Sequence, residues 1–249
     1  MKQNNFSKKR MIHIYIIALV LLILFITIGM IMIRYNVEGE KNPPFIVSKI
    51  NLISTAESDI KQDENEKWHA GILQKNDLFF TIEKNDEYKK VDTIKQIRLE
   101  NITITTQNED LIIAVYRPKS NSFDYSYTDE YKLEDKLIFD GAQETNMETL
   151  QINNQGGRIG LSAIINNLTE YDFGINEKVP SDGKLLSKAG IKIEDINFNI
   201  SFDLIIETGN GNKFKTHISH ELPTGNIMEE GVSSIEITNP ENVVFKRIK

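Results

Sequence analysis

Three tyrosines are the residues of this chain best suited to binding a ligand. Tyr125, Tyr127 and Tyr131 follow Phe123 closely, in a segment that also holds several carboxylates. A tyrosine ring offers a large, rigid face that can stack on a sugar or on a side chain of a protein partner, with little rotamer entropy to lose. The same alternation is typical of an irregular strand with one buried face, because tyrosine favours strands. We favour the buried face, and if the chain has a ligand site we expect it here.

Two further segments resemble metal sites in composition but not in spacing. His217, His220 and Glu221 are close in sequence, yet residues 217 and 220 of a strand point to opposite faces, whereas a zinc site needs converging ligands. The acidic run at residues 57–66 lacks the glycine that a calcium loop needs for its sharp turn, and a lysine interrupts it. We therefore expect no metal site and no cofactor.

The residue patterns of common catalytic and phosphate-binding motifs are also missing. Ser162 lies in the sequence GLSA, which is not the G-x-S-x-G turn of a hydrolase. The glycines at 156–160 and at 209–211 precede expected strands, whereas a phosphate loop precedes a helix, so we interpret them as turns. No catalytic residue is predicted. An envelope hydrolase or carbohydrate-active enzyme remains an alternative, because paired carboxylates can be distant in sequence.

An apolar segment near the N-terminus determines where these residues would be placed. Met11 to Ile33 is a run of 23 residues without a group that is charged at pH 7. As a helix it would be roughly 35 Å long, which is enough to cross a bilayer core of about 30 Å. The segment therefore predicts a single transmembrane helix.

The charges on either side of this segment predict its orientation. Four basic residues and no acidic residue precede it, whereas Glu38 and Glu40 follow it. An excess of Lys and Arg marks the cytoplasmic side, so we expect a cytoplasmic stub at residues 1–10 and an extracytoplasmic C-terminal part in the cell membrane. The apolar core is too long for a cleaved signal and ends without small residues, which indicates a retained signal anchor.

Composition restricts the part of the chain that follows the anchor. The whole chain has a net charge of −7, and all of the first 33 residues' charged groups are basic, so the remainder is still more acidic. An acidic surface repels nucleic acid, so no nucleic-acid partner is expected. Because the chain has 0 Cys, disulfides, thiolate metal sites and lipid attachment to an N-terminal cysteine are excluded.

Beyond a linker at residues 34–44, apolar and polar residues alternate. The clearest case is residues 196–206, followed by turn residues at 208–212 and renewed alternation at 214–218, which together predict a hairpin. Two more hairpins are expected, one turning at 75–77 between strands 68–74 and 78–83, the other at 154–157 between strands 149–153 and 158–165. Single strands are expected at 46–55, 94–106, 111–116, 137–139, 234–238 and 243–246.

Helices are expected only as short pieces in this region. Residues 181–189 can form one or two turns closed by Gly190, and residues 86–91 can form another. Residues 57–67 and 119–135 are expected to be exposed loops. Many short strands with few helices predict a mainly β chain, with an antiparallel β sandwich at 45–249 after the transmembrane segment at 11–33. One or two sandwich cores are compatible with this length.

The C-terminal third carries a resemblance. Its segments SDGKLLSKAGIKIEDINFNISFDLIIE, HELPTGN and NVVFKRIK resemble a group of uncharacterised single-pass membrane proteins of low-GC Gram-positive bacteria. The resemblance rests on no catalytic signature and implies no activity.

Three functions agree with these observations. Our leading hypothesis is a membrane-tethered extracytoplasmic binding or structural module, with an envelope protein or a glycan as its partner. The hydrolase above is the first alternative, and the second is an accessory subunit whose helix packs against another membrane protein. The oligomeric state is not predicted.

Overall fold

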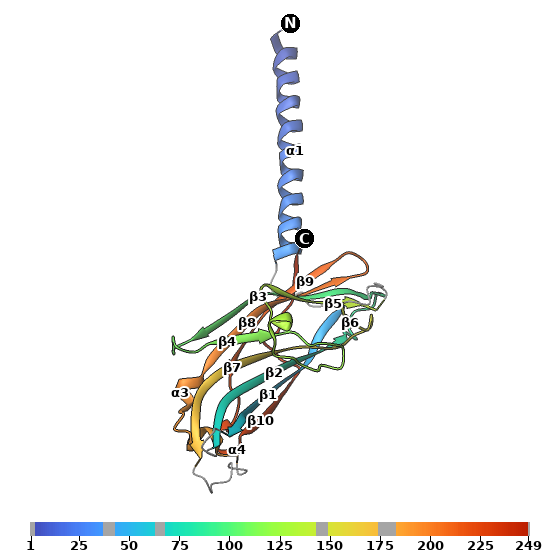
Figure 1. The fold of residues 1–249 in the computed structure, drawn as a ribbon. Coiled ribbons are helices and arrows are strands. Elements are labelled where there is room, and N and C mark those ends of the chain that lie inside the picture. The colour runs from blue at the N-terminus through green and yellow to red at the C-terminus, as the bar shows by residue number, and fades with distance from the viewer. Residues whose placement is uncertain (1–2, 37–42, 63–67, 143–148, 174–182, 249) are drawn as a thin grey trace.

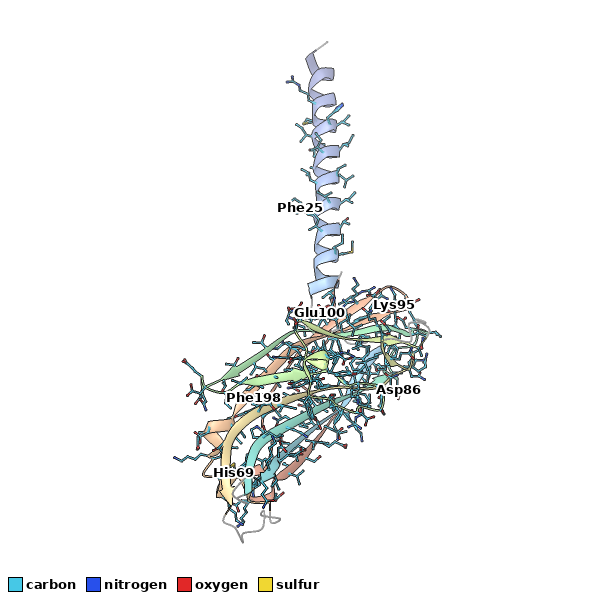
Figure 2. The ribbon with its side chains drawn as sticks, in the orientation of Figure 1. Phe25, His69, Asp86, Lys95, Glu100 and Phe198 are labelled. Carbon is cyan, nitrogen blue, oxygen red and sulfur yellow. The ribbon has the colours of Figure 1, made fainter. Side chains whose placement is uncertain are left out.

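A long helix and a β-rich body make up the protein (Figure 1). The computed structural model describes residues 3–36, 43–62, 68–142, 149–173 and 183–248. Helix α1 (Gln3–Asn36) projects from the body as a single rod, and its segment Arg10–Ile31 is apolar and long enough to cross a membrane. Side chains such as Phe25 project from it without touching the body (Figure 2). The expected single N-terminal apolar helix is confirmed.

Two sheets form the body, which confirms the predicted fold class. Sheet A has the order β10-β1-β2-β7-β4, and sheet B has the order β11-β9-β8-β3-β5-β6. All described strand pairs are antiparallel except β5–β6. The strands are β1 (Phe45–Gln62), β2 (Trp68–Lys84), β3 (Ile94–Thr106), β4 (Ile113–Tyr116), β5 (Lys136–Gly141), β6 (Leu150–Ile152), β7 (Gly157–Phe173), β8 (Phe198–Thr208), β9 (Lys213–Leu222), β10 (Val232–Thr238) and β11 (Lys246–Ile248).

The core lies between the two sheets. In the inner strands of both sheets alternate residues point into the core, and Leu78, Leu161 and Leu204 have no exposed surface. Phe80 of β2 and Phe202 of β8 meet across the sheets edge to face, with ring centroids 5.4 Å apart and planes at 82°. Edge-to-face contact places the positive ring edge against the negative ring face, which adds to the gain from burial. Residues of both sheets thus belong to one continuous apolar cluster.

The predicted hairpin at 196–218 is confirmed as β8 and β9. Phe198 pairs with Leu222 and Glu207 pairs with Lys213, and Gly211 adopts a φ of 75° in the turn. Ile196 differs from the prediction, because it ends the short helix α3 (Ile193–Ile196) instead of starting the strand. Its side chain is still buried in the core.

The predicted turn at 75–77 is wrong, because β2 continues through it as one strand. Asn76 points into the core, where its side chain exchanges two hydrogen bonds of 2.7 Å with the Gln74 amide. The Ser54 hydroxyl donates to Asn76 at 2.8 Å and accepts the Thr224 backbone N–H at 2.9 Å. Buried polar groups are stable when they are hydrogen-bonded, so residues that usually favour turns can lie inside a strand here.

The predicted hairpin at 149–165 is also wrong, although both of its strands exist. β6 pairs with β5 in sheet B, whereas β7 enters sheet A, so the turn between them connects the two sheets. Gly156 permits this turn, because its φ is 127° and a Cβ there would lie 2.4 Å from the Ile82 carbonyl oxygen. Gly160 lies within β7 and is not a turn residue.

Strand β1 is longer than predicted. Residues 57–62 were expected to be loop but extend β1, while residues 63–67 lie outside the described part of the chain. With β2 and β7 they form a three-stranded extension that points away from α1 (Figure 1). The other single strands are found at β3, β4, β5, β10 and β11, with bounds shifted by a few residues. At the C-terminus the strand is shifted by three residues, because β11 begins at Lys246 instead of Val243.

The remaining helices are single turns. Helix α2 (Leu185–Lys188) lies within the predicted segment and Gly190 follows it with a φ of 76°, as expected; Ser181 and Asp182 lie outside the described residues. Helix α4 (Ile227–Glu230) precedes β10. The helix predicted at 86–91 is wrong, because the Asn85 side chain accepts the Glu87 backbone N–H and forms a turn instead.

The inter-sheet aromatic pair provides a test of the core. Truncation by Phe202→Ala should lower the free energy of unfolding by about 3–5 kcal/mol, because it removes a fully buried ring and leaves a cavity. Denaturant unfolding of the full chain in detergent micelles, followed by circular dichroism of the strands, measures this. Val91→Ala is the control, because Val91 is 82% exposed, and should change stability by less than about 0.5 kcal/mol. A loss below about 1 kcal/mol for the Phe202 variant would contradict this description of the core.

Candidate functional site

The tyrosine segment lies against the outer face of sheet A. It runs from β4 through a single 3-10 turn at Asp129–Tyr131, and isolated bridges join Tyr116 to Lys132 and Pro118 to Tyr125. The segment is thus irregular, as expected, but it is held by pairing with itself and with the end of β4. It covers a small apolar cluster formed by Ala114, Tyr116 and Ile164.

Each predicted tyrosine has ring contacts within the protein. Tyr127 meets Tyr116 edge to face at 5.4 Å and lies parallel to Tyr125 at 6.5 Å. The Lys75 ammonium lies 4.7 Å from the Tyr127 ring centroid, and the Arg117 guanidinium lies 4.8 Å from that of Tyr131. These contacts agree with the interpretation that we favoured, in which the tyrosines form a buried aromatic face of an irregular segment. Binding of a ligand by Tyr125, Tyr127 or Tyr131 stays a prediction.

A second aromatic contact holds the start of this segment. Phe123 packs edge to face on Phe79 at 5.6 Å, and the Arg158 guanidinium lies 3.7 Å from the Phe79 ring centroid. Gly160 makes room for Phe79, because a Cβ at Gly160 would lie 2.6 Å from a carbon of that ring. The glycine is therefore a packing position beneath the segment.

Beneath the tyrosines lies a carboxyl group in an unusual environment. Asp77 of β2 stands opposite Ser162 of β7, which stands opposite Tyr116 of β4. Within the described part of the chain, Asp77 Oδ1, Ser162 Oγ and the Tyr125 hydroxyl are buried without a hydrogen-bond partner. Sequence reasoning missed Asp77, because the Asn-Asp pair resembled a turn.

Burial raises the pKa of Asp77 above its usual value of 3.8, although the Ser162 hydroxyl and the Lys75 ammonium act in the opposite direction. Burial likewise raises the pKa of Tyr127 to about 12, and the negative charge of Asp77 adds to this. A carboxyl of this kind binds its proton tightly, but the described structure places no histidine beside Ser162 that could activate it as a nucleophile. We therefore interpret the group as a buried polar cluster under an aromatic cover.

A cleft of about 410 Å³ opens at the side of the sandwich, near α3. Its walls are the connection between β3 and β4, the middle of β7 and the segment that joins α2 to α3. The lining residues are Asn108, Asp110, Leu111, Ile112, Ile165, Asn166, Leu168, Thr169, Ala189, Gly190, Ile191 and Asp195. We call this feature the lateral cleft. Its volume lies within the range of about 300–1,000 Å³ that is typical of ligand sites.

An irregularity in β7 creates the lateral cleft. Ile72 of β2 pairs with Thr169 and Gln74 pairs with Ile165, so β7 bulges between these pairs. β4 leaves β7 at the same point, because its pairing ends with Ile113 opposite Ile165. Bulges bend a strand and occur often beside functional sites. The departure of β4 and the bulge of β7 together open the edge of the sheet.

The cleft has an apolar floor and an acidic rim. Leu111, Leu168 and Ile191 belong to the partly buried layer around the core, whereas Ile112 is 75% exposed at the mouth. Asp110 and Asp195 are exposed carboxylates of the rim, and the lining contains no lysine, arginine or histidine. The Asn108 amide donates to the Asp195 carbonyl at 3.1 Å and so connects two of the walls.

The other predicted candidates lie apart from both places. His217 faces outward, with Nδ1 3.2 Å from an Asp203 oxygen, whereas His220 pairs with Ile200 on the inner face of β9. The expected opposite directions of the two imidazoles are confirmed. Burial lowers the pKa of His220. Within the described residues, no three histidine, aspartate or glutamate side chains gather as a metal site would require.

Sequence reasoning did not find the lateral cleft. Its residues come from three segments that are far apart in the chain, and none of them carries a motif. The one local signal is the apolar pair Leu111 and Ile112 directly after a polar turn, which is common in loops without function.

Comparison with known proteins supplied no relative. No family model, no curated protein and no solved structure matches the chain.

The buried carboxyl predicts a particular pH dependence. Its raised pKa means that the folded state holds the proton more tightly, so this contribution to stability is present at low pH and is lost as pH rises from about 3.8 through the raised value. Asp77→Asn removes the cost of the buried charge. The variant should therefore gain thermal stability relative to the natural chain at pH 7, and the gain should vanish at pH 3.

Thermal unfolding of the full chain in micelles, followed by circular dichroism at both pH values, measures this difference. Asp129→Asn, at an exposed position of the tyrosine segment that covers Asp77, is the matched control and should not reproduce the gain at pH 7. An Asp77→Asn variant that is less stable than the natural chain at pH 7 would show that the carboxylate is stabilised by its surroundings.

Proposed function

We propose that this protein is a membrane-tethered extracytoplasmic binding module that holds a partner in the lateral cleft. The observation that supports this most directly is the combination of one apolar helix, long enough to cross a membrane, with a sandwich that has a cleft at an open sheet edge. Clefts with an apolar floor and a few polar groups at the rim are typical binding sites. The partner is an envelope protein or a glycan.

The charge pattern supports the topology of this proposal. With basic residues only before the apolar segment, residues 1–10 stay in the cytoplasm, α1 is a retained signal anchor in the cell membrane, and the sandwich lies outside. The acidic surface keeps the sandwich soluble and away from anionic headgroups. α3, beside the cleft, lies in the part of the body that is distant from α1 (Figure 1).

The proposed mechanism is tethering. A membrane anchor confines the cleft to a layer next to the bilayer, which raises its effective concentration for neighbouring envelope molecules. β1 and its neighbouring strands extend the module away from the membrane, because a strand of 18 residues spans about 60 Å. A weak contact in the cleft is then enough to keep a partner in place.

A glycan hydrolase is the second candidate, because Asp110 and Asp195 line the same cleft. Glycosidases place two carboxyl groups on either side of the scissile bond. One oxygen of Asp195, however, accepts the Lys192 backbone N–H at 3.0 Å as part of the cap of α3. This structural role favours binding over acid catalysis.

The topology predicts a simple protection pattern. A protease added outside intact bacterial protoplasts should remove a C-terminal epitope and leave an N-terminal epitope attached to the membrane. Permeabilised protoplasts, in which both epitopes become accessible, are the control. Survival of the C-terminal epitope in intact protoplasts, with loss of the N-terminal epitope, would contradict the proposed orientation.

The binding role has its own test. The full chain, solubilised in detergent, should retain a partner that an Ile112→Asp variant loses, because a charge at the mouth opposes the apolar contact. Val91→Asp is the matched control, since Val91 is similarly exposed but lies outside the lining, and it should retain the partner. Equal retention by both variants would exclude the lateral cleft as the binding site.

A further inference from the structure

The lining of the lateral cleft combines two surfaces that rarely suit the same ligand. The walls offer the apolar side chains Leu111, Ile112, Leu168 and Ile191, and the rim offers the carboxylates of Asp110 and Asp195. A purely apolar group would gain nothing from these exposed carboxylates, and a small hydrophilic cation would leave the apolar walls uncovered. The lining therefore suits a group with an apolar stem and a positive end.

Lysine and arginine side chains have this composition. Both bury an aliphatic stem along apolar surface and keep the charged end in polar surroundings. The described chain does not supply such a group to the cleft itself. Lys188 ends α2 and Lys192 directly precedes α3, but neither residue is part of the lining.

The rim carboxylates are positioned to receive a positive end. The Asn108 side chain accepts the Asp110 backbone N–H at 3.1 Å, which fixes the turn that carries Asp110. Asp195 uses Oδ2 to accept the Lys192 backbone N–H at 3.0 Å, and its other oxygen is available to a ligand. No ion pair of the Asp110 carboxylate is found among the described residues.

The location of the cleft favours a peptide as the carrier of this group. β4 stops pairing with β7 at Ile165, and the described residues place no further strand beside Asn166 and Leu168. An extended chain can therefore follow the line of β4 along this edge while one side chain enters the cleft, as in partners that bind at sheet edges.

We propose that the lateral cleft binds an extended peptide segment of a partner protein through one lysine or arginine side chain. The aliphatic stem lies against Leu111, Ile112 and Ile191, and the charged end lies between Asp110 and Asp195. This inference rests on the proposed binding function and specifies its partner.

The test uses the full chain in detergent micelles and a fluorescent peptide of sequence Thr-Val-Thr-Lys-Thr-Val-Thr. Fluorescence anisotropy should show saturable binding, and replacing the lysine by norleucine, which keeps the stem and removes the charge, should weaken the affinity about tenfold. Glutamate at this position should abolish binding. No saturation by about 1 mM lysine peptide, or equal affinity for the norleucine peptide, would overturn the proposal.

Variants of the chain locate the contact. Asp110→Asn should weaken binding of the lysine peptide about tenfold and leave binding of the norleucine peptide unchanged. Asp110 is exposed and its side chain is not part of a cap, so this variant should fold, which circular dichroism checks. Glu130→Gln, an exposed carboxylate of the tyrosine segment, is the control and should not alter affinity. Equal losses in both variants would show attraction by overall charge alone and would overturn the site.

Two further outcomes separate this inference from the proposed function. The lysine peptide can fail to bind while the Ile112→Asp variant still loses a partner that Val91→Asp retains. In that case the proposed binding function is supported and the assignment of a peptide as the ligand is wrong. If spermidine binds as tightly as the peptide and displaces it, the site takes free polyamines, and the peptide assignment is also overturned.

Discussion

Burial of apolar side chains between sheets A and B is the interaction on which the rest of this structure depends. With 0 Cys, no disulfide joins the two layers, so contacts such as Phe80 on Phe202 must hold them together. The tyrosine segment lies on the outside of sheet A, and the lateral cleft opens at its edge. Both the tyrosine segment and the lateral cleft therefore depend on the packing of the inner faces of the two sheets.

A buried polar network sets the register of that packing. Ser54, Gln74, Asn76 and Thr224 are hydrogen-bonded to one another inside the core, so a slip of one residue in β2 would turn Asn76 outward and leave its partners unpaired. The next residue, Asp77, points to the opposite face and lies under the tyrosines. Two adjacent polar residues thus have different roles, one in a satisfied network and one in a buried cluster with unpartnered atoms.

The period-two alternation and the long apolar run were sufficient to predict the fold class, because each follows from local geometry. The β8–β9 hairpin was predictable for the same reason. Two other hairpins were predicted wrongly, since Asn76 is satisfied by distant residues and the turn at Gly156 connects strands of different sheets. In both cases the structure depends on contacts between residues that are far apart in the chain, and a single sequence does not show such contacts.

The candidate sites, too, depend on contacts between distant parts of the chain that the sequence does not show. The tyrosines were recognisable as a group, but their contacts with Lys75, Arg117 and Tyr116 depend on strands far away in sequence. The lateral cleft exists because β7 bulges where β4 leaves it, and its walls come from three separate segments. Such a site has no signature in a local pattern of residues.

The position of β1 has a mechanical consequence. β1 is the first strand after α1 and lies between β10 and β2, with antiparallel partners on both sides. A pull transmitted from α1 along this strand stretches many backbone hydrogen bonds in shear at once, instead of opening them one after another. For the proposed tethering function, this arrangement would place the load on the first strand after the helix, where many hydrogen bonds share it.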